Sequence, residues 1–443
     1  MTLIILNIDG LKDEIFRTAL PRTKFLKNFF TENSTLNSTF PSITFAAQCS
    51  ITTGVHPETH GVPGNQFLDR LGIYSNGTPF FYALDYGKGL NARVPAKVFV
   101  EPGLGNKLIS EDVETLYEYA RKLGKTSLVL NHMYSRGAHY WLRPSLPELY
   151  FSKRFWKGFY NFQKWFDTRS LRRFIKHIKH SSLPDLSMLY LMGLDNVSHR
   201  LGVEFQEKYL LEVIDPLFGE LLSTHKIARN IKNITFILLS DHGQMSFPSN
   251  DFEFKRIGGM KRKDNFFHGQ LKSSNFNLKD CDLVFGSNAS AGYLYVRKNG
   301  DSWSAEPSFS EVTEVAEKIY SESNGFISGV LLRDTENLGF QASYQALLPS
   351  GELTSVERLL EVQNIENFFG AERIFQSPGI LSPDIVLLCD TSNGNCFGPN
   401  FKGNHGGLSS DESQCVFAMN RDFSQIEGVR DLTFVKTVVE RFL

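Results

Sequence analysis

Short apolar runs that have the character of strands recur along this chain. They cover residues 3–8, 126–131, 186–192, 234–239, 384–389 and 414–419. An uninterrupted run such as 3–8 is typical of a strand that is covered on both faces. Helices are predicted at 22–32, 45–53, 112–123, 204–230, 309–322 and 429–443. With 443 residues, the pattern predicts one large α/β domain that carries insertions or a smaller cap.

Aspartates follow three of these runs closely, namely Asp9, Asp195 and Asp241. Open α/β sheets bind their ligands beyond the carboxyl ends of the strands. Taken alone, Asp9 is equally well explained as a turn or cap residue. However, His199 lies four residues beyond Asp195, so that both can face one point, and His242 directly follows Asp241. Three such strand ends are hard to explain by packing, and they indicate metal ligands.

Thr44 stands between a Pro–Ser turn and a small-residue helix that ends before Gly54. It is therefore expected at a helix N-terminus, where unpaired N–H groups and the helix dipole favour a phosphate. The hydroxyl has two interpretations there. It is either an N-cap, which is common for threonine, or a nucleophile that attacks a phosphorus held by the helix end.

Two more residues have both a structural and a functional interpretation. Asn65 follows Gly64 in a turn-rich loop, where it is either a turn residue or an amide donor to a phosphoryl oxygen. His405 is framed by Gly403 and Gly406 in a long loop. It has no core to pack in, so it is either a surface residue or a ligand that a tight backbone holds.

Composition narrows the class of protein. Hydrophobic residues make up 41% of the chain, which is enough for a sizeable core, and the net charge of −1 gives no sign of a polyanionic partner. No apolar run approaches the length of a membrane span. The first strand begins almost at the initiator Met, which leaves no room for a signal peptide. The five cysteines are scattered and odd in number, as in a reducing compartment. We therefore expect a cytoplasmic protein.

The stretch 151–180 has an unusual composition, with nine Lys and Arg residues against a single acid, Asp167, and interleaved aromatic residues. An apolar stripe at helical spacing runs through Leu171, Phe174, Ile175 and Ile178. The simpler interpretation is a lid or helical hairpin that packs on the main domain and has a solvated basic face. The alternatives are a surface for an anionic substrate or for a membrane. No nucleic-acid-binding motif is present. We expect a lid that contacts the leaving group of the substrate.

Together the candidate residues suit a two-metal centre. They are three carboxylates, three imidazoles and one hydroxyl: Asp9, Thr44, Asp195, His199, Asp241, His242 and His405. Mixed Asp and His ligation favours Zn2+, with Mn2+ as the alternative. Two ions roughly 4 Å apart clamp the entering and leaving oxygens of an in-line displacement at phosphorus. A metal would lower the pKa of the Thr44 hydroxyl. Asn65 and the Phe45 backbone N–H would stabilise the phosphoryl oxygens.

At this point the chain resembles a known family. The motifs that carry the resemblance follow one another as Asp9-Gly10, Phe40-Pro-x-x-Thr44-Phe45, Pro57-Glu-x-His60-Gly61, Asn65, Asp195-x-x-x-His199, Ser240-Asp241-His242-Gly243 and His405-Gly406. As a set they are similar to the type I phosphodiesterase/nucleotide pyrophosphatase branch of the alkaline phosphatase superfamily. The resemblance covers roughly residues 1–130, 185–245 and 383–420.

The resemblance implies a doubly wound, mostly parallel α/β sheet that is flanked by helices and carries inserted cap or lid segments. One zinc ion would be held by Asp195, His199 and His405. The other would be held by Asp9, Thr44, Asp241 and His242. Thr44 would form a covalent phosphoryl-enzyme intermediate, Asn65 would contact the phosphoryl group, and Phe45 would stack on the base of a nucleotide.

The domain division follows from the same comparison. The core would consist of residues 1–131, 183–245 and 381–443, with 132–182 as a basic aromatic lid. The segment 246–380 would form a surface excursion and a smaller cap.

Several substrates stay open. Asn131-His-Met-Tyr134 replaces the Trp-Pro-Gly stretch that is usual in nucleotide pyrophosphatases, whereas Gly61-Val-Pro-Gly-Asn65 is similar to phosphonoacetate hydrolases. We expect a hydrolase of small-molecule phosphodiesters or pyrophosphates, with a phosphonate or phosphate-monoester hydrolase as the alternative. A monoesterase needs extra positive charge near the phosphoryl group, for which Lys402 is a candidate. A catalytically silent module that binds phosphorylated ligands is the alternative from a different class.

Overall fold

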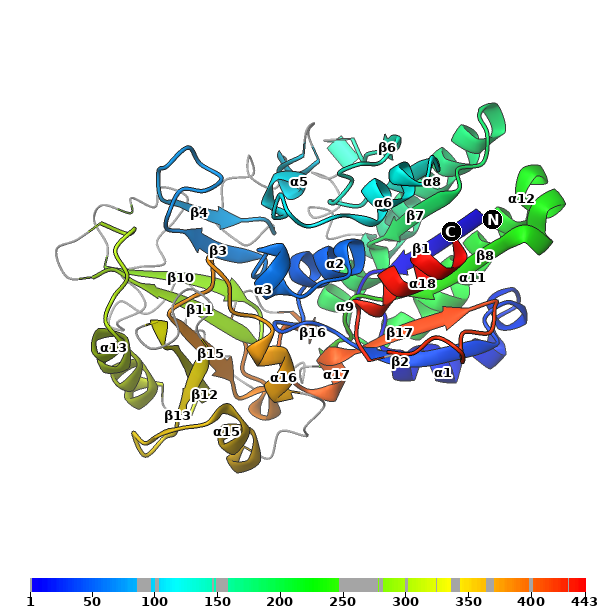
Figure 1. The fold of residues 1–443 in the computed structure, drawn as a ribbon. Coiled ribbons are helices and arrows are strands. Elements are labelled where there is room, and N and C mark those ends of the chain that lie inside the picture. Colours follow the sequence, from blue (N-terminus) through cyan, green and yellow to red (C-terminus); the bar gives the residue numbers. More distant parts are fainter. Residues whose placement is uncertain are drawn as a thin grey trace.

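The computed structural model describes residues 2–85, 97–99, 103–145, 147–148, 158–246, 278, 282–298, 302–323, 325–335, 343–363, 370–397, 401–428 and 430–443. Within them the chain forms a large sheet that is covered by helices and a smaller sheet beside it (Figure 1). The basic cluster at 261–263 and the N-terminal part of the 151–180 segment lie outside the described residues.

The large sheet is mixed but mostly parallel, as predicted. Its strands in spatial order are β2 (Glu32–Asn37), β17 (Gln414–Met419), β8 (Ile234–Leu239), β1 (Thr2–Ile8), β7 (Leu186–Leu191), β5 (Ser127–Leu130) and β6 (Tyr140–Leu142). Six of these seven strands run in the same direction, and β17 runs in the opposite direction. The central strand β1 pairs Leu3 with Leu186 on one side and with Thr235 on the other.

Helices cover both faces of this sheet, which explains the unbroken apolar run of β1. Ile4, Leu6 and Ile8 pack into the core on one face, and Leu3 and Ile5 pack into the core on the other. The first face carries α1 (Asp13–Ala19), α8 (Phe159–His180), α9 (Gly193–Leu201), α10 (Phe205–Tyr209), α11 (Asp215–Ser223) and α12 (His225–Asn230). The second carries α2 (Thr44–Thr53), α6 (Leu116–Lys122) and α18 (Phe434–Phe442).

The smaller sheet is antiparallel. Its strands in spatial order are β10 (Leu283–Asn288), β11 (Ala291–Val296), β15 (Ile385–Cys389), β12 (Ile327–Arg333), β13 (Tyr344–Leu347) and β14 (Leu353–Thr354). Three helices accompany it: α13 (Phe309–Glu322), α15 (Val356–Val362) and α16 (Gly370–Phe375). Shorter elements near the site are α3 (Pro57–His60), α5 (Leu104–Leu108), α17 (Ser410–Ser413) and the ladders β3–β4 (Gln66–Asp69, Phe80–Ala83) and β9–β16 (Met245–Ser246, Gly403–Asn404).

The helix predicted at 22–32 is wrong. The first helix is α1, and β2 already begins at Glu32. The buried Asp215 carboxylate accepts hydrogen bonds from the backbone N–H groups of Lys24, Phe25 and Leu26 at 2.8–2.9 Å. The Asp215 side chain, from α11, therefore pairs with these backbone donors, and short 3₁₀ turns form at Leu20–Arg22 and Leu26–Asn28.

The division into domains stays a prediction, although one strand of the 381–443 segment lies outside the large sheet. The strand β15 lies in the smaller sheet, between β11 and β12. Its apolar sequence suits a buried strand in either sheet, so periodicity alone does not assign it.

The described part of the 132–182 segment belongs to the main domain. The strand β6 extends the large sheet, and Leu171, Phe174, Ile175 and Ile178 of α8 pack into the core beneath it. Packing on the main domain is therefore confirmed for α8, whereas a lid that contacts the leaving group stays a prediction. Among the described residues, no helix is long and apolar enough to cross a membrane. The cytoplasmic location stays a prediction.

Candidate active site

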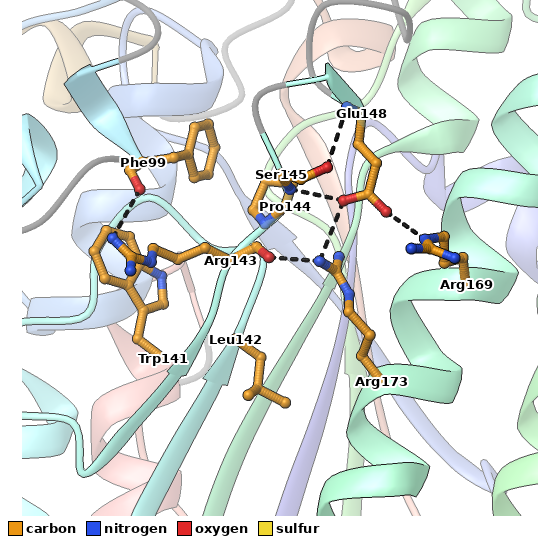
Figure 2. Close-up of a pocket in the computed structure, with 9 residues that line it drawn as sticks. All are labelled: Phe99, Trp141, Leu142, Arg143, Pro144, Ser145, Glu148, Arg169 and Arg173. Carbon is orange, nitrogen blue, oxygen red and sulfur yellow. Dashed lines mark hydrogen bonds and ion pairs between the residues drawn. The ribbon is translucent and has the colours of Figure 1, made fainter.

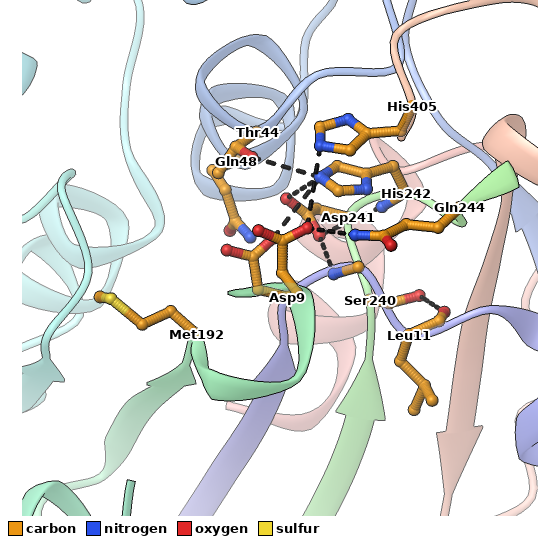
Figure 3. A network of polar contacts seen from close by, with 12 residues as sticks. Asp9, Leu11, Thr44, Gln48, Met192, Ser240, Asp241, His242, Gln244 and His405 are labelled. Carbon is orange, nitrogen blue, oxygen red and sulfur yellow. Dashed lines mark hydrogen bonds and ion pairs between the residues drawn. The ribbon is translucent and has the colours of Figure 1, made fainter. Parts of the chain in front are cut away.

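Three aspartates gather at the carboxyl edge of the large sheet, and two of them, Asp9 and Asp241, are labelled in Figure 3. Asp9 follows β1, Asp241 follows β8, and Asp195 lies in the first turn of α9, which begins directly beyond β7. Because these strands are parallel neighbours, their carboxyl ends lie at one edge of the sheet. All three residues are buried, with at most 8% of the surface of each exposed. The sequence pattern is therefore realised as one cluster.

The Thr44 hydroxyl is directed at this cluster. Ile43 occupies the N-cap position of α2, no side chain caps the helix, and Thr44 is its first residue. The Thr44 Oγ1 atom lies 3.2 Å from His242 Nε2. The N-cap interpretation of Thr44 is therefore excluded, and the hydroxyl is available for chemistry.

The remaining candidates complete a continuous network around His242 and Asp195. The His242 Nε2 atom lies 3.5 Å from Asp9 Oδ1 and 3.4 Å from Asp241 Oδ2. Asp195 Oδ1 lies 3.3 Å from His199 Nε2 and 3.8 Å from His405 Nε2. The rings of His242 and His405 stack with centroids 3.6 Å apart, which joins the two halves. The structure thus brings all seven predicted residues together.

The three histidines share one orientation. Each Nδ1 lies within hydrogen-bond distance of a backbone carbonyl: 2.8 Å to Gly403 O for His199, 3.0 Å to Gly243 O for His242, and 2.8 Å to Ser42 O for His405. If each Nδ1–H donates to its carbonyl, each Nε2 presents a lone pair to the carboxylates. This arrangement is typical of histidines that bind metals.

The carboxylates carry an electrostatic cost that a cation would relieve. Burial, together with the charges of Asp241 and Asp195, raises the pKa of Asp9 well above its usual value. Burial also raises the pKa of Asp241. Asp9 Oδ1 and Asp241 Oδ2 are buried and have no hydrogen-bond partner. Burial and the neighbouring histidines lower the pKa of His405, so this ring is neutral at pH 7. The donor set therefore fits divalent metal ions.

Three supporting residues were not predicted from the sequence. The Tyr190 hydroxyl donates to Asp9 Oδ2, and the Gln244 side-chain amide donates to Asp195 Oδ1. The Phe401 ring lies against His199, with centroids 4.4 Å apart. Gln244 comes directly after the Ser-Asp-His-Gly motif, so its position was a usable signal. Tyr190 lies within an apolar strand and gives no such signal.

Asn65 and Phe45 are joined to each other. The Phe45 backbone N–H was predicted to stabilise a phosphoryl oxygen. In the structure it instead donates to Asn65 Oδ1 at 3.1 Å. The Asn65 amide nitrogen is the group that is left to donate. The Phe45 ring meets Tyr134 edge-on. Lys402 is exposed, and its backbone N–H donates to His199 O at 2.9 Å.

Asp167, the single acid of the basic stretch, supports the helix that carries Asp195 and His199. The Asp167 Oδ2 atom accepts hydrogen bonds from the Tyr209 hydroxyl at 2.8 Å and from the Gly193 backbone N–H at 3.2 Å. A Cβ at Gly193 would lie 2.4 Å from Asp167 Oδ2, so only glycine fits there. Burial raises the pKa of Asp167 to about 7.

This raised pKa gives a testable pH dependence. Between about pH 4 and 7 the folded protein holds the Asp167 proton more tightly than the unfolded chain, so stability falls as the pH rises through this window. Asp167→Asn keeps an accepting oxygen but does not titrate. We expect it to gain on the order of 2–3 kcal/mol relative to the wild type between pH 5 and 8. Urea unfolding of the wild type and of Asp167→Asn at about pH 5 and 8 measures this change in relative stability. If the difference in stability between the two proteins is the same at both pH values, the raised pKa of Asp167 is contradicted.

A pocket of about 540 Å³ lies beside β6, apart from the seven clustered residues (Figure 2). Its lining includes Trp141 and three arginines. Arg169 and Arg173 both pair with Glu148, at 2.6 and 3.3 Å, and Arg143 lies over the Trp141 ring at 5.1 Å. All three arginines thus have structural partners. The ion pairs of Arg169 and Arg173 with Glu148 connect α8 to the segment after β6.

The mixed sheet, with this donor set at its carboxyl edge, has the alkaline phosphatase-like fold. The family model for type I phosphodiesterase/nucleotide pyrophosphatase matches residues 3–323. The chain belongs to this family.

Individual relatives are distant. The chain is 26% identical to a venom phosphodiesterase of Naja atra over 57% of its own length and 27% of that protein. It is also 26% identical to an uncharacterized pyrophosphatase/phosphodiesterase of Schizosaccharomyces pombe, over 55% of its own length and 44% of that protein. The chain thus spans less than half of these curated relatives.

Solved structures share the fold. Murine ectonucleotide pyrophosphatase/phosphodiesterase 5 aligns with a TM-score of 0.61 at 12% identity. The alignment covers 100% of this chain and 94% of the murine chain. Phosphonoacetate hydrolase from Sinorhizobium meliloti aligns with a TM-score of 0.59 at 15% identity and covers 100% and 96%. The fold expected from the resemblance is confirmed.

Proposed function

We propose that this chain is a two-metal hydrolase that cleaves phosphodiester or pyrophosphate bonds, with Thr44 as the nucleophile. The observation that carries the proposal is the Thr44 hydroxyl, which caps no helix and lies 3.2 Å from His242 within a buried cluster of carboxylates and imidazoles. A solely structural threonine at the start of α2 has no reason to face this cluster.

The proposed metal ligands form two sets. Asp195, His199 and His405 would hold one ion, and Asp9, Thr44, Asp241 and His242 would hold the other. The buried Asp9 Oδ1 and Asp241 Oδ2 atoms, which accept no hydrogen bond, support this assignment, as do the three histidines, each of which places Nδ1 beside a backbone carbonyl. When bound, two zinc ions would lower the pKa of the nucleophile and neutralise charge on the phosphoryl oxygens. Manganese is the alternative ion.

The residues of the chain would then carry out two displacements. In the first, the Thr44 oxygen would bond to phosphorus as the bond to the leaving oxygen breaks, and the Thr44 proton would pass through solvent to the leaving oxygen. In the second, water attacks the same phosphorus and restores the Thr44 hydroxyl. The Asn65 amide nitrogen would donate to a phosphoryl oxygen in both steps. In support, one solved structure of the fold is an inactive variant with a threonine replaced by alanine, in complex with AMP.

The substrate class is the open part of the proposal. The AMP complex favours a nucleotide-derived diester, for which Phe45 would contact the base. The phosphonoacetate complex of a neighbouring structure favours a phosphonate as the second candidate. Lys402 is exposed beside the end of α9 that carries His199, where it would supply the positive charge that a monoester or phosphonate requires.

A ratio of two activities tests the proposal. We expect kcat/KM of the zinc-loaded protein to be at least about 10-fold higher for bis-p-nitrophenyl phosphate than for p-nitrophenyl phosphate, because Lys402, the candidate charge for a dianionic monoester, is exposed to solvent and lies outside the buried cluster. Steady-state release of p-nitrophenol measures both. A ratio below one would overturn the diesterase assignment and direct the next assay to phosphonoacetate.

A further inference from the structure

The tight turn between β10 and β11 reaches from the smaller sheet into the catalytic edge of the larger one. Its first residue, Asn288, is fully buried. The Asn288 Oδ1 atom accepts hydrogen bonds from the backbone N–H groups of Asn65, at 2.7 Å, and Gln66, at 3.2 Å. Its Nδ2 donates to Gln66 O at 3.1 Å. One side chain thus fixes the backbone that carries Asn65.

The turn comes so close to the loops that carry Asn65 and His405 that a side chain would not fit at a neighbouring glycine in either loop. A Cβ at Gly64 would lie 2.5 Å from Asn288 Oδ1, and one at Gly406 would lie 2.2 Å from Asn288 O. The Ser290 backbone N–H donates to His405 O at 3.1 Å. The same turn therefore contacts the Asn65 loop and the loop of a candidate metal ligand.

The turn itself is held in an unfavourable conformation. Ala289 has a φ of +61°, which residues other than glycine rarely adopt. Its carbonyl accepts from the Phe397 N–H at 2.8 Å, and Ser290 O accepts from the Cys389 N–H at 3.0 Å. A strained backbone persists where its surroundings fix it, and such sites cluster at functional centres. The turn is thus a firm support for the loops that it contacts.

We propose that Asn288 is a positioning residue for phosphoryl transfer, which acts by orienting Asn65. The inference rests on the proposed function, in which the Asn65 amide donates to a phosphoryl oxygen. Asn65 Oδ1 is already bonded to the Phe45 N–H, so the direction of the Asn65 Nδ2 group depends on where its backbone lies. A displacement of about 1 Å in such a group can cost about 100-fold in rate. The smaller sheet is then part of the catalytic apparatus.

The test compares two buried or half-buried asparagines that bind backbone in the same way. Asn420 accepts from the Phe236 N–H at 2.8 Å and donates to Ile234 O at 3.1 Å, at the amino end of β8 and therefore far from the site. We expect Asn288→Ala to lower kcat/KM for bis-p-nitrophenyl phosphate about 10- to 100-fold with unchanged zinc content. We expect Asn420→Ala to change it less than about 2-fold. Equal losses in both variants would overturn the inference.

A double-mutant cycle separates positioning from general damage. Since Asn288 acts through Asn65, Asn288→Ala should cost less than about 2-fold in an Asn65→Ala background. A full additive loss there would also overturn the inference. If Asn288→Ala does not fold, the cycle is made with Asn288→Asp, which keeps the acceptor for the two N–H groups. This variant exchanges the donor to Gln66 O for a carboxylate oxygen that repels it, so it should lower activity alone and change it less than about 2-fold in the Asn65→Ala background.

Binding of orthovanadate, measured by calorimetry on the zinc-loaded protein, gives a readout that does not need turnover. Asn288→Ala and Asn65→Ala should raise its Kd by similar factors, while Asn420→Ala should not. If the wild type binds vanadate in this pattern but hydrolyses no phosphate ester, the proposed function fails and the positioning role stands. If the wild type is active and the Kd of Asn288→Ala is unchanged, the positioning role alone fails.

Discussion

Thr44→Ala should lower kcat for bis-p-nitrophenyl phosphate by at least about 10³-fold, because it removes the oxygen that attacks phosphorus. Thr44 Oγ1 is the one hydroxyl of α2 that faces His242, and no other group among the described residues of that helix can replace it at this distance. Thr44→Ser retains a hydroxyl at the same place and should retain measurable turnover. Steady-state kinetics at saturating zinc measures both variants.

Thr53 provides the matched control. It lies in the same helix, is fully buried, and donates its hydroxyl to Cys49 O at 2.8 Å. Thr53→Ala should therefore change stability but leave kcat within about 3-fold of the wild type, because surface and core substitutions away from the chemistry act on folding. Rapid quenching followed by mass spectrometry of the α2 peptide should detect the covalent adduct in the wild type. Full activity of Thr44→Ala would contradict the nucleophile assignment.

The sequence predicted the site better than it predicted its surroundings. Asp9, Asp195 and Asp241 were identifiable because each follows an apolar run, and the carboxyl ends of parallel strands meet. Thr44 stayed ambiguous, because a hydroxyl at a helix start is usually a cap. The contact between the Thr44 hydroxyl and His242 supports the proposed nucleophile role over a cap.

What escaped prediction depends on contacts between distant segments. Asp215 replaces the predicted first helix by accepting the N–H groups of residues 24–26, which lie about 190 positions away. Tyr190 is an ordinary strand residue until Asp9 is placed beside it. Asn288 lies more than 220 positions from Asn65. No local periodicity encodes such pairs, so they appear only when the chain is folded.

Removal of metal should abolish activity and destabilise the fold together. We expect dialysis against a chelator to lower kcat/KM by at least about 10³-fold, because the phosphoryl charge is then unneutralised. It should also reduce the free energy of unfolding by about 4 kcal/mol for each bound ion, relative to protein at a free zinc concentration near 1,000 times Kd. The buried Asp9 and Asp241 would then repel each other without a counter-ion. Activity assays and urea unfolding after adding back Zn2+ or Mn2+ measure both effects and identify the better ion.

His405→Ala should distinguish two metal sites from one. In the proposed arrangement it removes a ligand of the ion held by Asp195 and His199, so the metal content should fall from two ions per chain towards one. His60 is the matched control, because it is equally buried but its two ring nitrogens lie 3.0 Å from Ser50 Oγ and 3.1 Å from the Val62 N–H. His60→Gln should therefore retain both ions. Elemental analysis after gel filtration measures the stoichiometry. One ion per wild-type chain would contradict the two-metal assignment, since His242 would then serve a single centre together with its stacked partner His405.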